Sequence, residues 1–140
     1  MKLCELCQCL TGCKIHDYVE NEVVGITHDS RKVKKGYLFV AIQGCKQDGH
    51  DFIMDAMVNG AVAVVVEKRC EVAPHAPQIV VTDVRRALAC LSSHFYDNPS
   101  SKMTITGITG TNGKTTTSYL TKAIFEASGN EAGLIGTIQY

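Results

Sequence analysis

The sequence lacks a net charge, since its 140 residues carry 14 Lys and Arg against 14 Asp and Glu. Without an excess of positive charge, no broad field attracts the phosphates of nucleic acid or the headgroups of anionic lipid. We therefore expect no nucleic-acid partner. No apolar run approaches the roughly 18 residues of a membrane span, so we also expect no membrane-spanning segment.

The N-terminus lacks the charged region, long apolar run and small-residue cleavage site of a secretory leader. Seven cysteines make an odd number, which favours reduced thiols in a cytoplasmic protein over a disulfide framework. Cys4 and Cys7 form a C-x-x-C, but no second pair follows at zinc-ribbon spacing. We interpret Cys7 as an apolar residue of an amphipathic N-terminal helix, because four side chains recur at helical spacing (Leu3, Leu6, Cys7, Leu10).

The rest of the first hundred residues alternates between strand and helix patterns. Apolar runs predict strands over 37–42, 61–66 and 79–81, with a shorter one over 23–27, whereas 12–22 is predicted as a connection. One helix begins near Phe52 and ends at Gly60, and another begins at Asp83 as its N-cap. Pro99 and two serines mark 97–101 as a linker. We predict an α/β fold with two domains, 1–98 and 99–140.

The second domain begins with a predicted strand (103–108), a glycine-rich turn, a helix from Lys114 to about Ser128 and a strand over 133–138. The turn has the spacing G-x-x-G-x-x-G-K-T, a variant of the general phosphate loop. Glycines let the backbone approach a phosphate, the helix N-terminus and Lys114 add positive charge, and the Thr115 hydroxyl can hold Mg²⁺. The motif therefore predicts a site for ATP and Mg²⁺. One strand–loop–helix–strand unit cannot cover both faces of a parallel sheet, so we expect the chain to be the front of a longer protein.

Four stretches together carry a family resemblance. G-I-T-G-T-N-G-K-T-T-T (107–117) resembles the ATP loop of the Mur ligases, which add amino acids to the UDP-muramoyl precursor of peptidoglycan. H-D-S-R-K-V-K-K-G-Y-L-F-V-A-I-Q-G-C-K-Q-D-G-H-D-F-I (28–53), A-x-x-x-G-A-x-A-V-V (56–65) and G-L-I-G-T-I (133–138) resemble the MurE type. The implied fold is a Mur ligase uridine-binding domain followed by the first strand–P-loop–helix–strand of a P-loop ATPase-like central domain.

The resemblance implies an ATP-dependent amide-forming ligase. ATP phosphorylates the D-glutamyl carboxylate of UDP-MurNAc-L-Ala-D-Glu, and the amine of a diamino acid attacks the acyl phosphate. We expect meso-diaminopimelate as the commoner family outcome, with L-lysine as the alternative. The ligase also needs a modified lysine, further Mg²⁺ ligands and a C-terminal domain that do not lie within 1–140, so the chain alone is expected to be inactive.

Site residues follow from the same resemblance. The ATP-contacting loop comprises Gly110, Thr111, Asn112, Gly113, Lys114, Thr115 and Thr116. Lys114 is expected on the β- and γ-phosphates, as the one residue of this chain that stabilises the transferring group, and Thr115 on Mg²⁺. Residues expected to contact the UDP end of the substrate are His28, Ser30, Cys45, Lys46 and Gln47. At His28 the family commonly has an apolar residue, so the expected contact there is through the main chain.

Other interpretations stay open on the sequence alone. The D-S-R stretch can be a simple turn with a surface ion pair between Asp29 and Arg31, and Asp48 and His50 are interpreted as turn and capping residues. The chain can also be a non-catalytic module that binds a UDP-sugar or a nucleotide. A MurF-type ligase has a similar D-S-R and D-G-H pattern, whereas folate polyglutamylating ligases and other P-loop NTPases lack the first domain.

Overall fold

The computed structural model describes residues 1–45, 47–71 and 73–136. It divides the chain into two compact units, Met1–Lys102 and Met103–Tyr140, which are described separately. The boundary predicted between the two domains, 1–98 and 99–140, stays a prediction.

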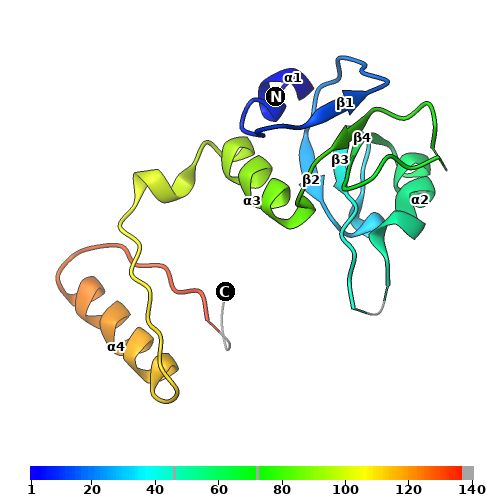
Figure 1. Ribbon diagram of the computed structural model, residues 1–140. Coiled ribbons are helices and arrows are strands. Elements are labelled where there is room, and N and C mark those ends of the chain that lie inside the picture. The colour runs from blue at the N-terminus through cyan, green and yellow to red at the C-terminus, as the bar shows by residue number, and fades with distance from the viewer. Residues whose placement is uncertain (46, 72, 137–140) are drawn as a thin grey trace. The chain divides into compact units, whose positions relative to one another are not determined.

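The first unit is built on a five-stranded sheet with the order β1-β5-β4-β3-β2 (Figure 1). Its strands are β1 (Lys14–His16), β2 (Gly25–Thr27), β3 (Tyr37–Val40), β4 (Ala61–Val66) and β5 (Gln78–Val80). β2, β3, β4 and β5 run parallel, and β1 pairs antiparallel with β5. The four parallel strands occupy the regions in which strands were predicted. β1 was missed, because it lies within the segment predicted as a connection.

Helices cover both faces of this sheet. Side chains of successive strand residues point to opposite faces, so an apolar strand presents apolar side chains to both. The helices of this unit are α1 (Leu3–Cys7), α2 (Ile53–Val58) and α3 (Val84–Phe95). Leu38 and Val40 of β3 belong to the core that includes α1 and α3, whereas Phe39 belongs to the core that includes α2. The result is a three-layer unit with the sheet in the middle, and the predicted α/β class is confirmed.

Short 3-10 helices complete the unit at η1 (Ser30–Lys32), η2 (Gly49–Phe52) and η3 (Pro99–Lys102). Several local predictions are confirmed. Asp83 caps α3, since its carboxylate accepts hydrogen bonds from the backbone N–H groups of Arg85 and Arg86 at 2.9 Å. Asp48 caps η2 in the same way, through the His50 N–H at 3.0 Å. Cys7 is buried in α1, and burial, reinforced by the neighbouring Cys13 thiol, raises its pKa to about 12.

The second unit contains one regular element, α4 (Lys114–Ala127), among its described residues. The helix ends as predicted at Gly129, which has a φ of 84°. The predicted strand over 103–108 is not formed, and residues 133–136 lie outside any sheet, while the rest of the predicted strand lies outside the described residues. A strand is held by hydrogen bonds to a neighbouring strand, and the described part of this unit offers no strand as a partner.

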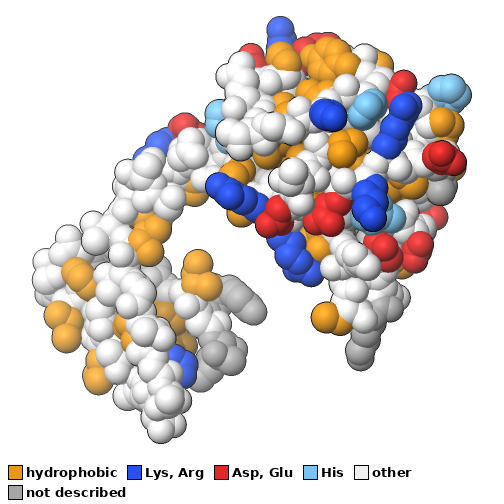
Figure 2. Space-filling view, viewed as in Figure 1, with side chains coloured by type: hydrophobic (Ala, Val, Ile, Leu, Met, Phe, Trp, Pro, Cys, Tyr) orange, Lys and Arg blue, Asp and Glu red, His pale blue; other side chains and the backbone are white. Residues whose placement is uncertain are grey.

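Apolar side chains of the second unit remain open to solvent. Ile105 is 65% exposed, Leu120 60% and Ile124 70%, and α4 has no buried residue. Figure 2 shows such apolar side chains on the visible face of this unit, where few charged groups interrupt them. This exposure agrees with the argument that one strand–loop–helix unit cannot bury its own apolar residues.

Candidate functional site

Two loops predicted to contact a UDP substrate lie at one edge of the first unit. β2 and β3 are parallel neighbours, so the segments that follow them, from His28 and from Ala41, leave the sheet at the same edge. The exits of β4 and β5 share this edge. Ligands of open α/β sheets bind outside the carboxyl ends of the strands. The topology therefore places His28, Ser30, Cys45 and Gln47 beyond the carboxyl ends of two neighbouring parallel strands. Lys46 lies outside the described residues.

The turn after β2 is held by its own side chains. Asp29 caps η1 through the Arg31 N–H at 3.1 Å and accepts two further hydrogen bonds from the Arg31 guanidinium, at 2.9 and 2.8 Å. Asn59, at the end of α2, donates its Nδ2 to the Ser30 carbonyl at 3.1 Å. The turn with an Asp29–Arg31 ion pair is confirmed. It presents Ser30 as a half-buried residue and His28 as an exposed one.

The Asp29–Arg31 pair makes a prediction for acid titration. Hydrogen bonds from the Arg31 side chain lower the pKa of Asp29 to about 2. A lowered folded-state pKa contributes stability above the unfolded pKa of about 3.9, and this contribution is lost as pH falls toward 2. We expect Arg31→Ala to raise the Asp29 pKa toward its ordinary value, as measured by carboxyl ¹³C NMR. Lys32→Ala removes an adjacent charge without the hydrogen bonds, so a shift as large as that of Arg31→Ala would contradict this assignment.

The loop after β3 is closed at its base. Gln43 and Asp48 form an antiparallel bridge, and the Gly44 N–H donates to the Gln47 carbonyl at 2.9 Å. The Gly49 N–H donates to the Ile42 carbonyl at 3.0 Å, and a Cβ at Gly49 would lie 2.6 Å from the Ile42 nitrogen. Only glycine permits this close approach. The closed base leaves Cys45 and Gln47 exposed at the tip.

The phosphate-loop residues of the second unit surround the N-terminus of α4. Gly113 is the N-cap and has a φ of 74°, a left-handed conformation that glycine adopts without strain. It brings no capping side chain, so the first turn of the helix is open to an external acceptor. The Thr117 N–H makes the helical bond to the Gly113 carbonyl at 2.9 Å. The preceding N–H groups, those of Lys114, Thr115 and Thr116, are positioned to bind an anion.

Lys114 folds back over this loop. Its ammonium donates to the Gly110 carbonyl at 2.6 Å and lies 3.4 Å from the Thr111 carbonyl. The side chain thus spans the turn and adds a positive charge at the mouth of the loop. A phosphate that entered would offer oxygens of full negative charge in place of two neutral carbonyls, and charge-assisted hydrogen bonds are the stronger ones. The residues present therefore fit a nucleotide phosphate.

A hollow of about 1120 Å³ lies beside α4 and reaches Lys114 and Thr115 at one end. Its lining mixes apolar side chains, such as Ile105 and Phe125, with polar and charged ones, such as Lys122. The loop residues from Gly110 to Gly113 are not among the residues that line it. We therefore interpret the hollow as the uncovered side of the unit next to the phosphate loop.

Neither the cysteines nor the helices of the described residues indicate a metal site or a membrane-spanning segment. In the described ranges, no group of three or more His, Cys, Asp or Glu side chains is placed to hold a metal ion. Every cysteine is a free thiol. None of the described helices combines the length and apolar character needed to cross a membrane.

Family models match both units. The model described as "Mur ligase family, catalytic domain" matches residues 22–96, which is more than half of the chain, and the model described as "Mur ligase middle domain" matches residues 108–140. The chain belongs to the Mur ligase family. The two candidate sites fall within separate matches, the nucleotide loop within the middle-domain match and the strand-exit loops within the other.

Curated Mur ligases are similar over most of the chain. One from Caldanaerobacter subterraneus subsp. tengcongensis is 49% identical over 118 residues, 84% of this chain and 24% of that protein. Another, from Syntrophomonas wolfei, is 44% identical over 138 residues, 99% of this chain and 28% of that protein. Both are named UDP-N-acetylmuramoyl-L-alanyl-D-glutamate–2,6-diaminopimelate ligase. The chain spans about a quarter of the length of these relatives.

Solved structures of Mur ligases share the fold. MurF from Acinetobacter baumannii superposes with a TM-score of 0.69 at 28% identity, covering 88% of this chain and 27% of that one. MurF from Thermotoga maritima, solved in complex with ADP, gives a TM-score of 0.57 at 31% identity and covers 73% of this chain and 23% of that one. The sequence-based prediction of a Mur ligase N-terminal and central-domain fold is therefore confirmed.

Proposed function

We propose that this chain is the front of an ATP-dependent ligase of peptidoglycan precursor synthesis, working in the cytoplasm. The ligase adds a diamino acid, meso-diaminopimelate, to UDP-MurNAc-L-Ala-D-Glu. The observation that carries the proposal is 44% identity over 99% of the chain to a relative that bears this activity in its name. Because the chain spans about a quarter of that relative, we assign the activity to the longer protein and a part of its binding machinery to these residues.

The first unit is proposed to bind the UDP end of the substrate. The half-buried Ser30 sits in a turn fixed by Asp29, Arg31 and Asn59, so its backbone needs little ordering to bind a ligand. The main chain at His28 and the exposed tip at Cys45 and Gln47, with Lys46 between them, complete the proposed contacts. These residues vary in chemical type, and the common property of His28, Ser30, Cys45 and Gln47 is their place at the carboxyl edge of the sheet.

The second unit is proposed to hold the phosphates of ATP. ATP, when bound, supplies the phosphoryl group that activates the substrate carboxylate. The backbone from Gly110 to Gly113 and the first turn of α4 would bind the phosphate oxygens, Lys114 would neutralise developing charge on the β- and γ-phosphates, and Thr115 would hold Mg²⁺. Phosphoryl transfer depends chiefly on such positioning and electrostatic stabilisation. The apolar face of α4 is proposed to pack against the further central-domain elements of the ligase.

A MurF-type activity is the second candidate, because a MurF structure superposes with a TM-score of 0.69. The solved structures do not separate the two types, since a solved diaminopimelate ligase is 30% identical and a MurF 31%. The curated relatives at 44–49% identity are named diaminopimelate ligases. We therefore favour addition of the diamino acid.

A hybrid ligase tests the proposal. In this hybrid, the 140 residues replace the matching segment of the Syntrophomonas wolfei relative. We expect it to convert UDP-MurNAc-L-Ala-D-Glu, ATP and meso-diaminopimelate into the tripeptide precursor, with one ADP formed per product, as followed by mass spectrometry and ADP release. A folded hybrid without product, alongside an active unmodified relative, would support a non-catalytic binding module instead.

A further inference from the structure

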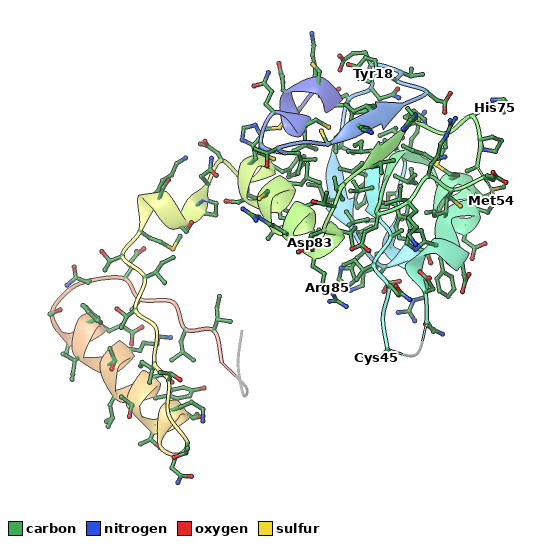
Figure 3. All side chains as sticks on the ribbon, viewed as in Figure 1. Tyr18, Cys45, Met54, His75, Asp83 and Arg85 are labelled. Carbon is green, nitrogen blue, oxygen red and sulfur yellow. The ribbon has the colours of Figure 1, made fainter. Side chains whose placement is uncertain are left out.

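A side chain outside the predicted site holds the loop after β3. Arg85, in the first turn of α3, donates Nη2 to the Gln43 carbonyl at 3.1 Å. Gln43 lies at the base of the loop that carries Cys45 and Gln47, so the hydrogen bond joins two elements 42 residues apart in sequence. Figure 3 shows Arg85 at the start of α3, on the side of the unit where the loop with Cys45 projects.

The backbone that carries Arg85 is fixed by two carboxylates. Asp83 accepts from the Arg85 and Arg86 N–H groups at 2.9 Å each, and Glu67, just after β4, accepts from the Val84 N–H at 3.2 Å. The first three N–H groups of α3 are therefore satisfied from the exits of β4 and β5. This anchoring ties the start of α3, and with it Arg85, to the carboxyl edge of the sheet.

Contacts within the loop close its base, and the Ala41 N–H joins its start to the Val65 carbonyl of β4 at 2.9 Å. The Gln43–Asp48 bridge and the Gly44–Gln47 hydrogen bond are both internal to the loop. The Arg85 guanidinium is a contact from a different element, and it acts on the strand of the loop that leads to Cys45. Because the acceptor is a main-chain carbonyl, the contact depends on Arg85 and on no particular side chain of the loop.

We propose that Arg85 is a positioning residue, which holds the loop after β3 in the orientation that receives the uridine end of a UDP ligand. The proposal rests on the proposed function, since it presumes that the carboxyl edge binds UDP. Arg85 acts through the loop. Removing it leaves the fold of the unit intact but allows the loop to sample other orientations, and a ligand must then order the loop as it binds.

Three variants of the whole 140-residue chain test this assignment. Arg85→Ala removes the hydrogen bond, Arg85→Lys keeps a donor and the charge, and Arg86→Ala removes the same charge from the next position of the helix. The measurements are calorimetric titration with uridine 5′-diphosphate and hydrogen exchange at the Gly44 amide without ligand. We expect Arg85→Ala to weaken UDP binding by about threefold to tenfold and to speed exchange by a similar factor. Arg85→Lys should recover part of both losses, and Arg86→Ala should resemble the unmodified chain.

The two readouts separate the inference from the function on which it rests. Equal UDP affinity and equal exchange in Arg85→Ala and the unmodified chain would overturn the positioning role. A similar loss in Arg86→Ala and Arg85→Ala would also overturn it, because charge alone would then explain the effect. If the unmodified chain binds no UDP while Arg85→Ala still speeds exchange, the hydrogen bond orients the loop but the proposed function is overturned.

Discussion

In the hybrid ligase, Lys114→Ala is expected to lower the rate of product formation by at least about 100-fold, the usual cost of deleting one group that stabilises transition-state charge. Lys114 is the first residue of α4, and its ammonium lies 2.6 Å from the Gly110 carbonyl of the phosphate loop. Alanine would leave the backbone donors of the loop in place but without the charge that balances the phosphates. Steady-state ADP release at saturating precursor and diaminopimelate measures the loss.

Lys122→Ala is the matched control for this change. Lys122 lies two turns further along α4 and pairs with Glu126 at 3.6 Å. Its replacement by alanine removes one positive charge, as Lys114→Ala does, but at a position away from the phosphate loop. We expect it to retain activity near that of the unmodified hybrid. Equal losses in both variants would assign the effect to the helix and would contradict a phosphate-binding role for Lys114.

Gln78→Leu is expected to destabilise the first unit by about 2–5 kcal/mol, because it leaves hydrogen-bonding groups unpaired in the interior. Gln78 is fully buried on β5. Its Oε1 accepts from the Cys70 N–H at 2.8 Å, and its Nε2 donates to the Cys70 carbonyl at 2.8 Å and to the Ala73 carbonyl at 3.0 Å. Leucine fills a similar volume but satisfies none of these groups. Urea unfolding followed by circular dichroism measures the change.

Gln8→Leu makes the same chemical change at an exposed position at the end of α1. Surface substitutions away from such networks usually change the free energy of unfolding by less than about 0.5 kcal/mol. A Gln78→Leu unfolding midpoint equal to that of Gln8→Leu would show that the three hydrogen bonds do not support the segment between β4 and β5. A lower midpoint for Gln78→Leu alone is the expected result.

Local signals predicted most of the first unit. Continuous apolar runs located β3, β4 and β5, since strands covered by helices on both faces need apolar side chains toward both. Asp83 predicted the start of α3, and Gly60 the end of α2, because capping and left-handed backbone depend on the residue itself. Such features can be predicted from a short segment, because they do not depend on residues far away in the sequence.

The missed features depend on pairing between distant residues. β1 has three residues and forms by pairing Lys14–His16 with β5, more than sixty positions away, so no local pattern predicted it. The opposite error occurred at 103–108, where an apolar run predicted a strand. The run has the composition of a strand but no partner strand in the described part of its unit.

The candidate site shows the same division. The sequence located both loops of the first unit and the phosphate loop through short motifs. The contacts that fix them were missed, because Asn59 and Arg85 act through main-chain carbonyls of Ser30 and Gln43. Every residue has a main-chain carbonyl, so the sequence of a loop does not indicate which carbonyl accepts a hydrogen bond. In the sequence, Asn59 and Arg85 resemble ordinary surface residues of α2 and α3.

Calorimetric titration of the 140-residue chain with UDP-MurNAc-L-Ala-D-Glu tests the central claim most directly. We predict saturable binding of one ligand per chain, unchanged by Lys114→Ala, and weak or no binding of Mg-ATP under the same conditions. Absence of precursor binding by a chain whose circular dichroism shows an intact fold would contradict the assignment of the first unit. A tight Mg-ATP complex abolished by Lys114→Ala would contradict the view that the phosphate loop needs the rest of the ligase.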